Sequence, residues 1–198
     1  VEAGDATEVE QVVDVAHQVD GPVFIRQLRG RVPRLFDPSD RMVLGKARRL
    51  SSGKDLTLLS SGICTEEAMR ATAVLSERGV RIEHLHISTL KPFDDPTVLD
   101  SIAGAERGVV TMENHLVSGG LGTAVAEIMA GHGFGKELRR IGLHDTFAHG
   151  GSRPYLMEEY GLDATALVRE VEQVVGEPLG ITADDLAAVR LDDVPSAA

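Results

Sequence analysis

The stretch Thr111-Met-Glu-Asn-His-Leu-Val-Ser-Gly-Gly-Leu-Gly122 decides the fold class of this chain. Its first residues continue a β-rich run that starts at Gly108, and that run ends in the polar cluster Glu113-Asn114-His115. A glycine cluster then opens an amphipathic helix that extends from Gly119 to about Met129. A strand, a polar turn and a glycine-rich helix start are typical of the carboxyl edge of an open α/β sheet, where functional groups gather.

The residues around this stretch repeat the same alternation of strands and helices. Short apolar runs bounded by turn residues predict strands, and apolar residues at helical spacing predict helices. Such an alternation favours an α/β fold with a doubly wound, mostly parallel sheet. The predicted strands are 56–60, 81–88, 108–112 and 138–144; the predicted helices are 95–103, 119–129, 153–160, 164–175 and one from 65 to a stop at Gly79.

The first 36 residues have a different organisation. Asp5 and Glu8 have the spacing of a capping box, and apolar spacing predicts a helix over 5–19. The run Val23-Phe-Ile25 predicts a buried strand. One helix and one strand cannot bury their apolar faces alone, so we expect 1–36 to be the end of a preceding domain.

Three further segments complete the expected organisation. Residues 37–54 are polar and basic and are predicted to be a linker or a peripheral connection. A complete α/β domain is expected over 55–176. The acidic tail, 177–198, is expected to be helical near 183–190 and to fray after Asp193.

Composition excludes several classes of protein. The net charge of −11 argues against nucleic-acid binding, because phosphate backbones require clustered positive charge. No apolar run approaches the roughly 18 residues of a membrane helix, and no signal-peptide pattern opens the chain. The one cysteine, Cys64, excludes an internal disulfide framework. We therefore expect a cytoplasmic protein without nucleic-acid or membrane partners.

Positive charge is concentrated between Arg26 and Arg49. This basic strip is either a solvated surface or an anion-binding edge, and the sequence leaves both readings open. Arg26 and Arg29 are its most informative members, because they follow the predicted strand 23–25 directly. The planar guanidinium fork suits bidentate phosphate binding at such a position.

Other motifs favour structural roles. The helix start Gly119–Gly122 could bind an anion, but Val125 replaces the third small residue of a dinucleotide fingerprint, so close packing is the preferred interpretation. His84 and His86 share a strand face without a third metal ligand at suitable spacing. No G-x-S-x-G elbow occurs, and Cys64 is expected to pack near a helix start. We predict no metal site and no catalytic residue in this chain.

Several motifs, in order, resemble the C-terminal half of transketolase-type enzymes, which depend on thiamine diphosphate. The resemblance covers nearly the whole chain, and it is closest to the C-terminal subunits of split bacterial transketolases. Deoxyxylulose-phosphate synthase is similar too, and 2-oxoacid dehydrogenase β subunits less so. The matching motifs are Gly4-Asp-Ala-Thr-Glu8, Asp20-Gly-Pro-Val-Phe-Ile-Arg26, Arg29-Gly-Arg-Val-Pro33, Ser61-Gly62, Thr89-Leu-Lys-Pro-Phe-Asp94, Glu113-Asn-His115, Gly119-Gly-Leu-Gly122 and Tyr160-Gly-Leu-Asp163.

The resemblance implies transfer of a two-carbon ketol unit from a ketose phosphate to an aldose phosphate. Thiamine diphosphate with Mg²⁺ supplies the chemistry in such enzymes, and protein groups orient the substrates. The family's phosphate-binding arginine corresponds best to Arg29, four residues before Pro33, with Arg26 as the second candidate. Residues 1–36 would be the end of the pyrimidine-binding domain.

The resemblance also implies what this chain lacks. The G-D-G segment that binds pyrophosphate and magnesium is absent from the sequence, as is the part of the pyrimidine domain that activates the cofactor. We therefore expect no cofactor binding or turnover by this chain alone. The expected partner is an N-terminal transketolase subunit or domain, in a homodimer or heterotetramer. Glu113, Asn114 and His115 are expected at an interface or site edge. The alternatives are a non-catalytic docking or regulatory module, or the C-terminal part of a deoxyxylulose-phosphate synthase or of a 2-oxoacid dehydrogenase β subunit.

Overall fold

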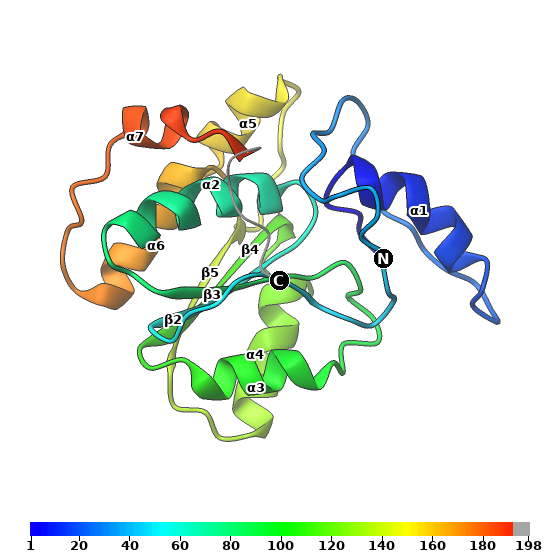
Figure 1. The fold of residues 1–198 in the computed structure, drawn as a ribbon, viewed down its shortest axis with the longest axis horizontal. Helices are drawn as coiled ribbons and strands as arrows, with labels where there is room; N and C mark the ends of the chain where they lie inside the picture. Colours follow the sequence, from blue (N-terminus) through cyan, green and yellow to red (C-terminus); the bar gives the residue numbers. More distant parts are fainter. Residues whose placement is uncertain (192–198) are drawn as a thin grey trace.

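The computed structural model describes residues 1–191 as one five-stranded sheet covered by helices on both faces (Figure 1). The strand order is β1-β3-β2-β4-β5. A helix from the N-terminal segment lies beside this sandwich rather than on either face of it (Figure 1). The strands are β1 (Arg48–Ser51), β2 (Leu56–Ser60), β3 (Ile82–His86), β4 (Gly108–Leu116) and β5 (Glu137–Leu143). The helices are α1 (Ala6–Ala16), α2 (Cys64–Glu77), α3 (Pro96–Gly104), α4 (Leu121–Gly131), α5 (Arg153–Glu159), α6 (Ala164–Val175) and α7 (Ala183–Ala188).

The predicted mostly parallel, doubly wound sheet is confirmed. Strands β3, β2, β4 and β5 pair in parallel, and only β1, at the edge, is antiparallel to its neighbour. Helices α2 and α6 cover one face, and α3 and α4 cover the other (Figure 1). Because successive side chains of a strand point to opposite faces, Leu58 joins the core under α2 and Leu59 joins the core over α3. Every residue of β2 is buried.

Three local predictions are wrong. The expected linker 37–54 contains strand β1, whose pairing with β3 makes it part of the sheet. The expected buried strand at 23–25 does not form. An isolated bridge to Glu2 occurs at the next residue, Arg26, and Phe24 is 80% exposed. Strand β4 does not end at Met112 but continues through the polar cluster to Leu116, with a register irregularity between those two residues.

Most helix predictions are confirmed to within a few residues. Helix α6 has the predicted bounds, and α7 falls within the predicted 183–190. The first helix ends at Ala16, before the predicted 19. Fraying after Asp193 concerns residues that lie outside the described ones.

Asp5 fixes the start of α1 and folds the N-terminal segment, residues 1–36, back on itself. Its Oδ1 accepts the N–H of Glu8 at 2.8 Å, as the predicted N-cap requires. Its Oδ2 accepts the N–H groups of Leu35 and Phe36, each at 2.9 Å. The reciprocal half of the predicted capping box does not form, because the Glu8 side chain turns to Gly4 N–H and to the sheet instead.

A chain of buried hydrogen bonds joins the N-terminal segment to the sheet. Glu8 Oε2 lies 2.9 Å from Nε2 of His86, whose Nδ1 lies 2.7 Å from Thr65 Oγ1. Thr65 continues to Ser60 Oγ at 2.9 Å, and Ser60 continues to Nε2 of His84 at 2.7 Å. All five side chains are buried. We call this set, Glu8, His86, Thr65, Ser60 and His84, the buried polar chain.

Burial and pairing shift the pKa values at the two ends of the buried polar chain. Burial alone would raise the pKa of Glu8, but His86, the N–H of Gly4 and the charge of Arg48 together outweigh it, so the pKa of Glu8 lies below its usual value. Burial lowers the pKa of His84 to about 3, and the nearby His86 adds to this effect. His84 is therefore neutral in the folded protein near neutral pH.

The neutral state of His84 predicts a specific loss of stability in acid. The unfolded chain protonates His84 below about pH 6.5, but the folded protein does so only near pH 3. Because the unfolded state binds the extra proton, this group should lower the free energy of unfolding by about 2 kcal/mol between pH 7 and pH 5. Glutamine does not titrate. In urea unfolding at pH 7 and pH 5, the free energy of unfolding of His84→Gln should therefore fall by about 2 kcal/mol less than that of the wild type. Equal losses in the two proteins would contradict a buried neutral His84.

Candidate functional site

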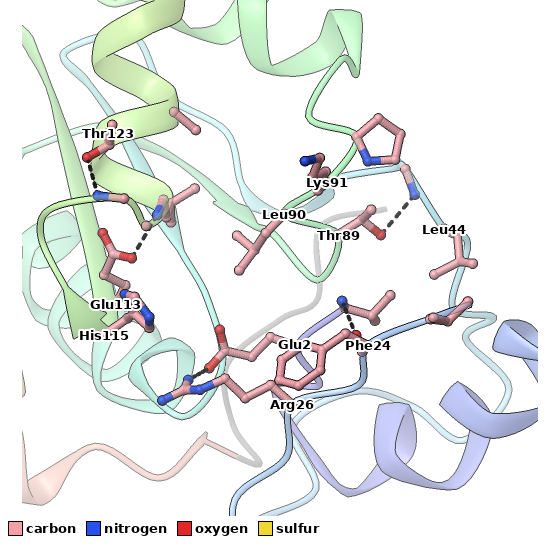
Figure 2. A pocket seen from close by; sticks show the side chains of 18 of the residues that line it. Glu2, Phe24, Arg26, Leu44, Thr89, Leu90, Lys91, Glu113, His115 and Thr123 are labelled. Atoms are coloured by element: carbon pink, nitrogen blue, oxygen red, sulfur yellow. Dashed lines mark hydrogen bonds and ion pairs between the residues drawn. The ribbon is translucent and has the colours of Figure 1, made fainter. Parts of the chain in front are cut away.

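A cavity of about 880 Å³ lies between the N-terminal segment and the carboxyl edge of the sheet (Figure 2). The N-terminal segment, the loop after β3, the end of β4 and the start of α4 contribute to its walls. Phe24 and Leu90 supply apolar surface, and Arg26 and His115 supply polar groups (Figure 2). Ligands of open α/β sheets bind outside the carboxyl ends of the strands, so this cavity is the candidate site.

Glu113 occupies the anion position at the start of α4. Its two carboxylate oxygens accept the N–H groups of Leu121 and Gly122, each at 2.7 Å. An anion could bind at this glycine-rich helix start, and the chain supplies one itself. Burial raises the pKa of Glu113, although the two backbone N–H groups act in the opposite direction. The N-terminus of α4 is therefore closed by an internal carboxylate.

Arg26 is held at the edge of the cavity by two other residues. Its Nη1 forms an ion pair with the buried carboxylate of Glu2 and donates to Asn114 Oδ1 at 3.1 Å. Its Nη2 donates to the backbone oxygen of Asn114 at 2.9 Å. The Arg26 side chain remains 35% exposed. These contacts bring together segments that lie far apart in the sequence.

The structure brings most of the predicted site residues together. Arg26, Glu113 and His115 line the cavity, and Asn114 contacts Arg26. Arg29 is exposed and does not line the cavity. Its assignment to substrate phosphate stays a prediction.

Glu2 is the site residue that the sequence analysis missed. It is 4% exposed and pairs with Arg26, which follows it by 24 positions. No motif surrounds Glu2 in the sequence, and its partners become its neighbours only in the folded chain. No local signal could therefore have identified it.

The histidines of β3 and the single cysteine take part in packing and buried hydrogen bonds, outside the cavity. Within residues 1–191, no group of three or more His, Cys, Asp or Glu side chains is placed to hold a metal ion. His84 and His86, the predicted strand-face pair, both belong to the buried polar chain. Cys64 is buried at the start of α2, as expected, and burial raises the pKa of its thiol. In the same residues, no helix has the length and apolarity of a membrane span.

Residues 45–167 match the family described as Transketolase, C-terminal domain. The chain belongs to this family. The matched residues contain the whole sheet and the loops at its carboxyl edge. The N-terminal segment, which carries Glu2 and Arg26, lies outside them.

Three relatives bear out the resemblance to the transketolase family. A transketolase family protein of Sinorhizobium fredii is 39% identical over 175 residues, which make up 87% of this chain and 51% of that protein. A 6-deoxy-6-sulfo-D-fructose transketolase subunit of a Clostridium species is 43% identical over 155 residues, or 78% of this chain and 48% of the subunit. A 1-deoxy-D-xylulose-5-phosphate synthase of Parabacteroides distasonis is 34% identical over 78% of this chain and 24% of the synthase. The chain thus spans about half the length of the first two relatives.

A solved structure agrees with these sequence relatives. It is described as a split gene transketolase, inactive β4 tetramer, and it superposes with a TM-score of 0.79 at 35% identity. The superposition covers 88% of this chain and 57% of the other. The structural similarity thus covers more of the chain than residues 45–167, the part that matches the family.

The residues described here do not fit thiamine diphosphate, the cofactor of transketolase-family enzymes. Three carboxylates line the cavity, those of Glu2, Glu113 and Glu127. The first two already have partners: Arg26 for Glu2, and the start of α4 for Glu113. No cluster of metal-type side chains lies in residues 1–191. Ligands for a diphosphate and its cation would have to come from other parts of the complete enzyme.

The internal carboxylate at α4 leads to a stability prediction. A Cβ atom at Gly120 would lie 2.0 Å from Glu113 Oε2, so Gly120→Ala would displace the carboxylate from its backbone donors. The backbone at Gly120 is extended and accepts alanine, so steric contact alone should destabilise the variant, by about 2 kcal/mol.

Gly131→Ala is the matched control for that variant. It lies in the same helix, and its added Cβ would meet nothing within 4 Å. We expect no loss of stability there, because alanine is the better helix former. Urea unfolding of the two variants makes the comparison. Similar free energies of unfolding would show that the contact between Gly120 and Glu113 does not matter for stability.

Proposed function

We propose that this chain is the C-terminal part of a transketolase, which transfers a two-carbon ketol unit between sugar phosphates. The complete enzyme would use thiamine diphosphate and Mg²⁺ held outside this chain. Membership of the transketolase C-terminal family and the likeness to a split gene transketolase support this proposal. The observation that carries it is a fixed, partly exposed guanidinium, that of Arg26, at a cavity of about 880 Å³.

In this proposal Arg26 binds the phosphate of a sugar substrate. It lines the cavity, and its backbone is fixed by a hydrogen bond from its N–H to the oxygen of Val1 at 2.8 Å. A guanidinium binds phosphate through paired donors, and a substrate held in this way keeps its reacting end at a set distance. Arg29 is the second candidate, since only its surroundings in the complete enzyme decide whether it reaches substrate.

The complete enzyme would contain an N-terminal subunit or domain, in a homodimer or heterotetramer. Exposed apolar side chains on and near the N-terminal segment support this part of the proposal: Phe24 is 80% exposed, Val13 63% and Val43 55%. Exposed apolar side chains that lie together mark surfaces that a partner covers. The split gene transketolase of similar structure is itself an assembly of subunits.

A second activity is favoured by one of the relatives. The synthase of Parabacteroides distasonis aligns with the same region of this chain, so the complete enzyme could instead form 1-deoxy-D-xylulose 5-phosphate. An assay for that product separates it from ketol transfer between sugar phosphates. Absence of both activities in the complete protein with thiamine diphosphate would favour the docking module.

The phosphate assignment is tested by Arg26→Lys in the complete enzyme. Lysine keeps a positive charge beside the buried Glu2 but loses the planar fork, whereas alanine would leave that carboxylate unpaired. We expect KM for the phosphorylated aldose acceptor to rise about 10- to 100-fold, with kcat nearly unchanged, because a hydrogen bond to a charged group is worth about 1.5–3 kcal/mol.

Arg29→Lys provides the matched comparison. It changes an exposed arginine, three positions away, that does not line the cavity. If Arg26 alone binds the phosphate, the KM values of Arg29→Lys should equal those of the wild type. The reverse pattern, with an effect only at Arg29, would move the phosphate site to that residue. A wild-type enzyme that transfers no ketol unit would overturn the proposed function itself.

A further inference from the structure

Arg26 uses only part of its hydrogen-bonding capacity. A guanidinium has five N–H donors, and here both terminal nitrogens donate to Asn114 while Nη1 also pairs with Glu2. The remaining edge, formed by Nε and the second hydrogen of Nη2, has no partner within residues 1–191. Some side-chain nitrogens and oxygens in residues 1–191 are buried without a hydrogen-bond partner, and Nε of Arg26 is not one of them. Because Nε has no partner, it is accessible to solvent.

Asn114 accepts two hydrogen bonds from Arg26, because β4 is irregular there. The parallel register with β5 runs to Met112 and resumes only at Leu116. The backbone oxygen of Asn114 is thereby available to Arg26 Nη2 at 2.9 Å, and its side-chain oxygen accepts from Nη1 at 3.1 Å. Irregularities of this kind redirect groups next to functional sites.

Gly62 provides the space for this arrangement. A Cβ atom at Gly62 would lie 2.3 Å from Glu2 Oε1 and 3.0 Å from Asn114 Oδ1. Its φ of +54° also favours glycine. The turn after β2 thus has no side chain at the one position where the two acceptors of Arg26 converge.

We propose that Asn114, with Glu2, is a positioning residue that fixes Arg26 so that its Nε–Nη2 edge is presented to an oxyanion. The two acceptors engage the far side of the guanidinium, which leaves one bidentate edge in a fixed orientation. The identification of the oxyanion as a sugar phosphate rests on the proposed function. The positioning itself does not, because inorganic phosphate would bind the same edge.

The first test measures binding of inorganic phosphate to the complete protein by calorimetry. Asn114→Ala removes the side-chain acceptor, and we expect phosphate affinity to fall at least tenfold. Asn114→Asp keeps an oxygen in that place and should remain within about threefold of the wild type. Ser118→Ala, an exposed residue of the same loop, is the control and should bind phosphate unchanged.

The second test separates positioning from a purely structural role. In the complete enzyme, Asn114→Ala should raise KM for a phosphorylated acceptor at least tenfold, with kcat within about threefold and KM for the unphosphorylated sugar unchanged. Phosphate affinity that is the same in wild type and Asn114→Ala, or a wild type that binds no phosphate, would overturn the inference. So would a lower melting temperature as the only effect of the variant. Phosphate binding as expected without ketol transfer would retain the positioning role and reject the proposed function.

Discussion

The buried contact between the carboxylate of Glu8 and the imidazole of His86 is the interaction on which the arrangement of this chain depends. A carboxylate and an imidazole are costly to bury unless each finds a partner, and here each is almost fully buried and 2.9 Å from the other. His86 lies at the end of β3, an inner strand of the sheet, so its contact with Glu8 ties α1 to that end of the sheet. The ring of Phe36, at 5.2 Å from His86, adds packing to the same contact. The N-terminal segment is thereby placed against the edge of the sheet where Arg26 meets Asn114.

Two acidic residues of the cavity, Glu113 and Glu2, also find partners within the chain, but with different consequences for the site. Both carboxylate oxygens of Glu113 accept backbone N–H groups at the start of α4, so these donors are not available to an external anion. Glu2 is paired with Arg26 but leaves part of that guanidinium exposed. These two carboxylates therefore have internal partners, and the guanidinium of Arg26 stays partly available. Such a site suits recognition of an anionic substrate, and the chemistry of the reaction would come from the rest of the enzyme.

The sequence predicted the elements of the domain well, because strongly apolar strands such as β2 and well-capped helices such as α6 have local signals. It did not predict β1, whose short polar run Arg48–Ser51 becomes a strand only by pairing with β3. It overestimated 23–25, an apolar run that forms no strand and has only an isolated bridge beside it, at Arg26. At the candidate site, four residues that were singled out from their place after strands, Arg26, Glu113, Asn114 and His115, come together in the structure, whereas Arg29 does not line the cavity. The roles expected of these residues stay predictions. The partners Glu2 and Glu8 depend on contacts between distant segments, for which a single sequence carries no signal.

Native mass spectrometry of the protein purified from its own source, with thiamine diphosphate quantified, tests the central claim most directly. The account predicts a polypeptide much larger than the 21.2 kDa of this chain, or a stable complex of two kinds of subunit, carrying the cofactor. A lone species of 21.2 kDa without cofactor or partner would contradict it. The fold would then have been retained without the chemistry, and a docking role would be the better explanation of this chain.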